Sequence, residues 1–199
     1  IDQINNDLKS NQKMFRLLQG DVGSGKTIVS FIVAMNVVSS GFQVCFMAPT
    51  EVLAKQHYML AKKLFNKNIN IKLLTSKTEY RERKEILSDL DNNIINIVIG
   101  THSLFQEKIK YHNLGLIIID EQHKFGVKQR KKLSDKGGKN CDILVMSATP
   151  IPRTMIMTIF GDMDISIIKN KPKLRKEIKT YSKLETKIRD IIKFIQKQI

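Results

Sequence analysis

A glycine-rich stretch near the start of the chain has the residue types and spacing of a polyphosphate-binding loop. It fits the pattern G-x-x-x-x-G-K-[ST] and consists of Gly20, Asp21, Val22, Gly23, Ser24, Gly25, Lys26 and Thr27. Glycines in such a loop let consecutive backbone N–H groups turn toward phosphates without a Cβ atom in the way. We expect Lys26 to reach the β and γ phosphates of a nucleotide, and the Thr27 hydroxyl to bind Mg²⁺.

The pair Asp120-Glu121, which follows an aliphatic run at 116–119, is the second candidate for chemistry. A phosphate-binding loop holds a nucleotide, but fast hydrolysis also needs a carboxylate on the metal and a group that orients water. Such a pair is often only the start of a solvated loop. If the pair lies in the same sheet as the phosphate-binding loop, we expect Asp120 to complete a metal site with Thr27 and Glu121 to position water. The predicted catalytic residues are therefore Lys26, Asp120 and Glu121.

Alternating apolar segments predict the elements that position these residues. Residues 15–18 read as a strand before the loop, and residues 28–38 as a buried helix after it, so a phosphate would meet a helix N-terminus. Further strands are expected at 43–48, 71–74, 94–99, 116–119 and 143–146, and helices at 1–13, 51–65, 78–90 and 182–199. Strands that are apolar on both faces and alternate with helices predict an α/β fold whose parallel sheet is covered by helices on both faces.

In such a sheet, function collects where the strands' carboxyl ends meet the following loops. Gly23, Thr50, Thr101, Asp120 and Ser147 all occupy that kind of position, which predicts one functional surface. Thr50 is also an ordinary N-cap for the helix at 51–65, and Thr101 an ordinary turn residue. We interpret His57 and His112 as structural, because no partner carboxylate or metal-ligand spacing accompanies them.

Composition limits the class of protein. The 199 residues suffice for one α/β domain with a small appendage, and 42% hydrophobic and 27% charged residues are typical of a soluble globular protein. No run approaches the roughly 18 apolar residues that span a bilayer, so no membrane association is expected. Cys45 and Cys141 lack metal or redox spacing and are predicted to be buried free thiols in a reducing compartment, the cytoplasm.

The net charge of +15 has two explanations that charge alone leaves open. A polyanionic partner such as nucleic acid is one. The other is an A+T-rich coding sequence, because the chain is rich in Lys, Asn and Ile and its lysines are spread along its length. The only compact basic cluster lies at 128–132.

Taken together, the motifs resemble those of superfamily 2 helicases and, more specifically, the RecG-like family of ATP-dependent DNA helicases of replication-fork repair. The resemblance is carried by the loop and by segments 48–57, 100–106, 120–127 and 147–154, in order and at family-like spacing, and it extends from residue 14 to about residue 168. Lys124 stands where the family commonly has Arg, and Pro172-Lys173-Leu174-Arg175 stands where Pro-Gly-Arg is common. Transcription-repair coupling factors are the nearest rival family, but segment 122–127 favours the RecG-like one.

This resemblance implies a RecA-like helicase lobe at 1–168 and, at 169–199, a linker and the start of a second lobe. It implies ATP and Mg²⁺ as cofactors and branched DNA as partner. Residues implied to couple nucleotide state to DNA are Gln122, His123, Ser147, Ala148, Thr149 and Arg153. Residues implied to touch the DNA backbone, where contacts carry no sequence information, are Pro49, Thr50, Gly100, Thr101 and His102.

We expect the chain to be part of a longer protein, because it begins without Met and lacks the N-terminal wedge domain and second lobe of RecG-like enzymes. The second lobe brings an arginine finger that is worth about 10³–10⁵ in rate, so ATPase activity of the chain alone is expected to be near background. Two other classes remain: a small P-loop kinase or phosphotransferase, for which no acceptor lid is found, and a non-catalytic nucleic-acid-binding module, against which intact Lys26, Asp120 and Glu121 argue.

Overall fold

The computed structural model describes residues 1–66, 68–105, 109–121, 141–149, 163–169 and 187–196. Its centre is a seven-stranded sheet in the order β3-β4-β2-β5-β6-β1-β7, and every pair of neighbours is parallel. The strands are β1 (Phe15–Gly20), β2 (Gln43–Met47), β3 (Ile71–Leu74), β4 (Ile97–Gly100), β5 (Leu114–Ile119), β6 (Asp142–Ser147) and β7 (Asp164–Ile168). The helices are α1 (Asp2–Leu8), α2 (Lys26–Ser39), α3 (Glu51–Leu64), α4 (Tyr80–Asp91), the 3₁₀ helix η1 (His102–Phe105) and α7 (Ile188–Gln196).

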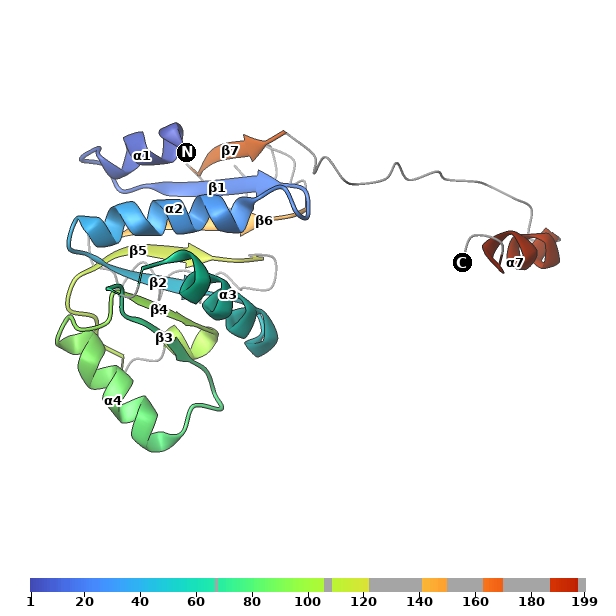
Figure 1. The fold of residues 1–199 in the computed structure, drawn as a ribbon. Coiled ribbons are helices and arrows are strands. Elements are labelled where there is room, and N and C mark those ends of the chain that lie inside the picture. Colours follow the sequence, from blue (N-terminus) through green and yellow to red (C-terminus); the bar gives the residue numbers. More distant parts are fainter. Residues whose placement is uncertain (67, 106–108, 122–140, 150–162, 170–186, 197–199) are drawn as a thin grey trace.

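Two hydrophobic clusters, one on each face of the sheet, hold the helices in place. On one face, Phe31 and Ala34 of α2 and Ala54 of α3 pack on strand residues such as Phe46, together with Ile4 of α1. The other face is covered by α4 and η1, through a cluster that includes Ile86, Leu90 and Leu104. The central strands are buried along their length because both of their faces are covered. The predicted α/β fold with a parallel sheet covered on both faces is therefore confirmed (Figure 1).

Two elements were not expected from the sequence. Strand β7 lies at the edge of the sheet beside β1; of its five residues Ser166 is buried, Asp164 and Ile167 are exposed, and the other two are half-buried. An edge strand has one open side, so it lacks the aliphatic run that marks a central strand. The second element is η1, where the sequence suggested only a turn after Thr101.

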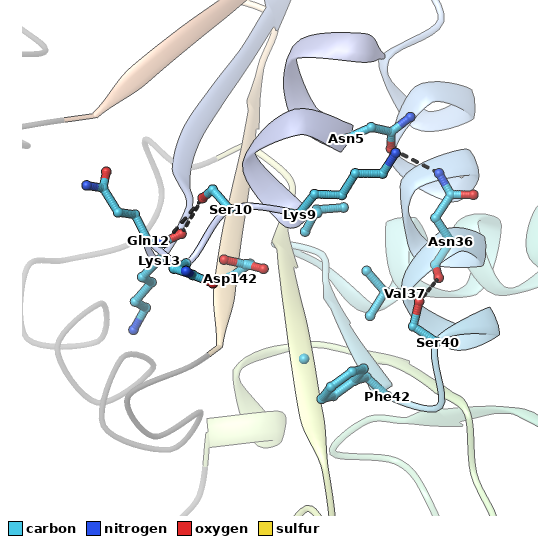
Figure 2. A pocket seen from close by; sticks show the side chains of 13 residues that line it. Asn5, Lys9, Ser10, Gln12, Lys13, Asn36, Val37, Ser40, Phe42 and Asp142 are labelled. Atoms are coloured by element: carbon cyan, nitrogen blue, oxygen red, sulfur yellow. Dashed lines mark hydrogen bonds between the residues drawn. The ribbon is translucent and has the colours of Figure 1, made fainter.

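A cavity of about 680 Å³ lies at the amino ends of the strands, which we call the amino edge of the sheet. It lies between the first residues of the central strands and the last turns of α1 and α2, and Figure 2 shows Lys9, Lys13, Asn36, Phe42 and Asp142 around it. This cavity is on the opposite edge from the phosphate-binding loop. It is therefore distinct from the functional surface predicted from the sequence.

Helix α7 is amphipathic and stands apart from the sheet in Figure 1. Its apolar residues Ile188, Ile192 and Ile195 are 58%, 50% and 50% exposed. No helix within the described ranges is long and apolar enough to cross a membrane. Both cysteines are free and buried, as predicted, and burial raises the pKa of the Cys141 thiol to about 12, which makes it a poor nucleophile.

Candidate nucleotide-binding site

The phosphate-binding loop connects the end of β1 to the start of α2. Gly23 and Gly25 have φ angles of 79° and 95°, in the left-handed region that glycine enters without a Cβ penalty. A Cβ atom on Gly20 would lie 2.6 Å from Ser24 Oγ and 3.1 Å from Ile168 Cβ, so a side chain at this position would force its neighbours to shift. At Gly25 an added Cβ atom would meet none of the described residues within 4 Å, so this side of the loop is open toward them. The loop therefore has the conformation and the open face that phosphate binding needs.

The polar groups of the loop fit a polyphosphate. Lys26 Nζ donates to the carbonyl oxygens of Gly20 (2.8 Å) and Asp21 (3.0 Å), which holds the ammonium group across the loop. Gly25 is the N-cap of α2 and offers no side-chain acceptor, so the first N–H groups of the helix are available to an anion. Ser24 Oγ is buried and has no hydrogen-bond partner among the described residues. An unsatisfied donor, an ammonium group and a helix N-terminus are the donor set that phosphate oxygens require.

Asp120 lies at the carboxyl end of β5 and is held at two points. Its backbone N–H donates to Met47 O of β2 at 2.8 Å, and its Oδ2 lies 2.8 Å from His57 Nε2. The residue is only 9% exposed. Glu121 follows with φ of 52°, a left-handed conformation that costs a residue with a side chain roughly 1–2 kcal/mol. The strain coincides with the residue predicted to position water.

His57 is the functional candidate that the sequence analysis missed, and its assignment as a histidine without a carboxylate partner was wrong. It lies on the buried face of α3 together with Ala54 and Ala61, and its ring centroid is 4.7 Å from that of Phe46. The signal was present in the spacing, because a polar residue on the core face of a helix needs a partner. What the sequence could not give was the identity of that partner, 63 residues away. For His112, the described contact is with a backbone carbonyl, that of Asp91.

The Ser147-Ala148-Thr149 segment at the end of β6 is tied to the start of the loop. Ser147 Oγ accepts from the Thr149 backbone N–H at 3.2 Å and lies 2.9 Å from Thr149 Oγ1. Thr149 O in turn accepts from Gln19 Nε2 at 3.0 Å, and Gln19 directly precedes Gly20 in β1. A movement of residues 147–149 would therefore displace Gln19 and, through it, Gly20 at the start of the loop. Gln19 was not singled out from the sequence, because a single polar residue closing an apolar strand carries no distinct signal.

The residues expected at the DNA backbone follow β2 and β4, which are neighbours in the sheet. Ala48 N–H donates to Gly100 O at 2.9 Å, so these two segments are in contact. Thr50 is exposed and its hydroxyl accepts from Leu53 N–H, which confirms the predicted N-cap of α3. Packing alone also explains the glycine at position 100, because an added Cβ atom would lie 2.0 Å from Leu74 O. The remaining residues of this set are half-buried or exposed, namely Pro49, Thr101 and His102.

The carboxyl edge of the sheet, where the strands end, therefore has two halves on either side of β5: one carries the phosphate-binding loop, and the other carries the residues predicted to touch DNA. In the order of the strands, β5 is separated from β1 by β6 alone, so Asp120 lies about 10 Å from the loop's strand at a spacing of about 4.8 Å per strand. Strands β2 and β4 lie on the far side of β5. Asp120 therefore stands between the phosphate-binding half and the half predicted to touch DNA. The other predicted residues, Gln122, His123 and Arg153, and the basic cluster at 128–132 lie outside the described residues.

No ready-made metal cage is found in the part of the chain that the structure describes, where no three His, Cys, Asp or Glu residues gather. Magnesium is usually held by one or two protein groups together with water and substrate phosphates. A site made of Thr27, Asp120 and the phosphates of a nucleotide has that character. The residues present therefore fit Mg²⁺ when it arrives with a nucleotide.

Next to Thr50, in the half of the carboxyl edge predicted to touch DNA, Glu51 begins α3 and forms a small polar cluster. The Ser76 hydroxyl donates to Glu51 Oε1, and Lys77 Nζ lies 3.3 Å from Oε2. Mainly because of the Ser76 hydrogen bond, the pKa of Glu51 is lowered from its ordinary value. The cluster joins the start of α3 to the loop after β3.

A phosphate-binding loop and an Asp-Glu pair at one edge of a parallel sheet define a nucleotide-binding α/β domain. Comparison with known proteins identifies the class: the family model of DEAD/DEAH box helicases matches residues 2–158, and the chain belongs to this family.

Within that class the chain is similar to ATP-dependent DNA helicase RecG. It is 47% identical over 198 residues to RecG of Thermotoga maritima, covering 99% of this chain and 25% of that protein. It is 46% identical over 200 residues to RecG of Bacillus subtilis, covering 100% of this chain and 29% of that one. A solved structure of RecG bound to a three-way DNA junction matches with a TM-score of 0.83 at 43% identity, over 98% of this chain and 26% of the other. The chain thus spans between a quarter and a third of the length of these relatives.

Proposed function

We propose that this chain is the nucleotide-binding first lobe of a RecG-type DNA helicase, an ATP-dependent translocase on branched DNA in replication-fork repair and recombination. The observation that carries the proposal is the placement of the Lys26 loop and the Asp120 carboxylate on one edge of the sheet. The similarity to RecG from several bacteria supports the choice within the helicases. The lobe is taken as residues 1–168, and it works in the cytoplasm.

In this proposal the loop residues 20–27 bind the phosphates of ATP. The Lys26 ammonium exchanges its two carbonyl partners for phosphate oxygens, and the Ser24 hydroxyl gains the partner that it lacks. Thr27 and Asp120 hold Mg²⁺, which when bound neutralises charge on the phosphates. Glu121 orients the attacking water next to them. Gln122, His123, Arg153 and the 147–149 segment pass the nucleotide state to the DNA side of the edge.

DNA is proposed to lie along the half of the edge formed by β2 and β4. Pro49, Thr50, Gly100, Thr101 and His102 then touch the sugar-phosphate backbone, through hydroxyl and backbone N–H groups that read no sequence. A relative of this chain, RecG, has been solved on a three-way DNA junction, and this supports branched DNA as the substrate. Asp120 lies between the two halves, which is the position from which nucleotide chemistry and DNA contacts can influence each other.

Residues 169–199 are proposed to lead into a second helicase lobe. Helix α7 supports this, because its isoleucines are half exposed and an amphipathic helix gains most of its stability by packing its apolar face. The second lobe supplies the arginine finger, and a wedge domain elsewhere in the same protein contacts the junction. The chain alone is therefore expected to bind ATP but to hydrolyse it near background, since an arginine finger is worth about 10³–10⁵ in rate.

The test is Mg²⁺-dependent ATP binding by calorimetry, with the Lys26→Ala variant. Hydrogen bonds to charged groups contribute about 1.5–3 kcal/mol each, so affinity should fall by roughly 10- to 100-fold. Lys63→Ala is the matched control, because it removes the same charge from an exposed position near the end of α3. Equal affinity in the two variants would refute the nucleotide site. Brisk DNA-stimulated ATP turnover by the chain alone would refute the need for a second lobe.

A further inference from the structure

The contact between His57 and Asp120 joins a helix of the proposed DNA half to the carboxylate of the proposed metal site. His57 Nε2 and Asp120 Oδ2 are 2.8 Å apart, and both residues are below one tenth exposed. A carboxylate only accepts hydrogen bonds, so Nε2 carries the hydrogen and donates it. Oδ2 uses one of its lone pairs in this bond, whereas both lone pairs of Oδ1 remain for the metal or one of its waters.

The imidazole is fixed by its surroundings. Its ring centroid lies 4.7 Å from that of Phe46 on β2 and 6.5 Å from that of Phe31 on α2, the latter in an edge-on arrangement. Phe31 and Phe46 are themselves in contact and almost fully buried. The donor is therefore presented to Asp120 from a rigid aromatic cluster, and the carboxylate cannot rotate without losing its hydrogen bond.

Partners of this kind, which touch a metal ligand and not the metal, orient the ligand. Among the described residues, the other anchor of Asp120 is its backbone N–H, which donates to Met47 O; this bond fixes the main chain and leaves the side chain to rotate. The hydrogen bond from His57 fixes the orientation of the Asp120 side chain. Because His57 belongs to α3, whose first residues follow the predicted DNA contacts at Pro49 and Thr50, a movement of α3 would also move the carboxylate.

We infer that His57 is a positioning residue for the magnesium site: its Nε2–H holds one oxygen of Asp120 and thereby directs the other toward the metal that accompanies the nucleotide. This inference rests on the proposed function. It predicts that His57 acts on metal affinity specifically, and that loss of its hydrogen bond leaves the phosphate-binding loop unchanged.

Two substitutions separate the hydrogen bond from the ring packing. His57→Phe keeps an aromatic ring against Phe31 and Phe46 and removes the donor. His57→Gln gives up the ring and places an amide N–H near the position of Nε2. The measurement is a Mg²⁺ titration of the chain saturated with a fluorescent ADP analogue, alongside the affinity for the same analogue in EDTA and the melting temperature.

We expect His57→Phe to weaken Mg²⁺ binding by about 10-fold, the lower end of the effect of losing such a partner, with unchanged affinity in EDTA. His57→Gln should stay within about 3-fold of wild type. A purely structural role would give the opposite order, with Gln the more damaging change. Wild-type Mg²⁺ affinity in the Phe variant would overturn the inference, and tighter binding would mean that His57 competes with the metal.

If the Phe variant does not fold, the pair His57→Gln and His57→Asn replaces it. Asn is too short to reach Asp120 Oδ2, so it should lose about 10-fold in Mg²⁺ affinity where Gln does not; equal affinities would overturn the inference. Lys26→Ala separates this result from the proposed function. Loss of nucleotide in Lys26→Ala together with wild-type Mg²⁺ affinity in His57→Phe refutes the inference alone. Unchanged nucleotide affinity in Lys26→Ala refutes both.

Discussion

The two edges of this sheet both bury charged side chains, but they use them differently. Near the amino edge, Arg16 is 7% exposed and all three of its guanidinium nitrogens face acceptors: Asp7 Oδ2 at 2.5 Å, Ser166 Oγ at 3.0 Å and Asp164 Oδ2 at 3.6 Å. These contacts tie α1 and β7 to β1. At the carboxyl edge, the partners of Lys26 within the described part of the chain are two carbonyl oxygens of its own loop.

This difference separates a structural charge from a functional one. The charge of Arg16 is balanced by side chains of the fold itself, so nothing further is needed there. The partners of Lys26 are neutral carbonyls that a phosphate can replace, and Asp120 has one oxygen held by a neighbour and one left for a ligand. Burial and pairing alone do not mark a site. A functional site is indicated by a charged group that still has bonding capacity for a ligand and that lies at the carboxyl edge of the sheet.

Removing Arg16 should give the largest change in stability. Arg16→Met leaves Asp7 without its ion-pair partner and removes the donor to Ser166 Oγ, which keeps its bond to Gln3; loss of a hydrogen bond to a charged group costs about 1.5–3 kcal/mol. Urea denaturation should show this loss in the free energy of unfolding, while affinity for Mg²⁺ and ADP stays at the wild-type value. Arg81→Met on the exposed side of α4 is the matched control and should be neutral. A loss of nucleotide affinity in Arg16→Met would remove the distinction between the two edges.

Much of this arrangement was open to prediction from the sequence. The central strands are aliphatic because both faces of a parallel sheet are covered, and this pattern located β1, β2, β5 and β6. The loop between β1 and α2 followed from its spacing. Since all strand ends in a parallel sheet point the same way, the shared edge also followed.

The remainder depended on contacts between distant residues. Strand β7 was missed because Asp164 and Ser166 interrupt its pattern, and their role becomes visible only when Arg16 lies beside them in register. The partner of His57 was missed because no local pattern links position 57 to position 120. Pairing between polar side chains far apart in sequence is decided by the tertiary fold.

Thr50→Ala should have a smaller effect and tests what Thr50 does at the carboxyl edge. The Thr50 hydroxyl caps α3 by accepting from Leu53 N–H, and loss of such a cap costs about 1 kcal/mol. Thr50→Ser keeps the oxygen and should be close to wild type in stability. Forked-DNA binding, measured by fluorescence anisotropy beside thermal melting, then separates the two roles. DNA affinity that falls in Thr50→Ala and returns in Thr50→Ser would support a hydroxyl contact; unchanged affinity would assign Thr50 to capping alone.

Asp142→Asn should have the smallest effect, and it tests the opposite edge with a residue that resembles Asp120. Asp142 begins β6, and its Oδ1 accepts from Met14 N–H at 2.7 Å, which joins the chain before β1 to β6. Burial raises the pKa of Asp142 above its ordinary value of 3.8, and Asp7 also raises it, while the Met14 hydrogen bond and Lys13 act in the opposite direction.

Because the pKa of Asp142 is higher in the folded state than in the unfolded state, the folded protein binds more protons as the pH falls. Stability from this group is therefore present at low pH and is lost as the pH rises from the ordinary value through the raised one. Asn is neutral and keeps the acceptor for Met14, so the variant should lack this loss and be slightly more stable than wild type at pH 7, with the difference closing at pH 3. Urea denaturation at both pH values measures it. A variant less stable than wild type at pH 7 would mean that the charge of the Asp142 carboxylate stabilises the amino edge, as the charge of Arg16 does, and would contradict the destabilising effect of burial that its raised pKa implies.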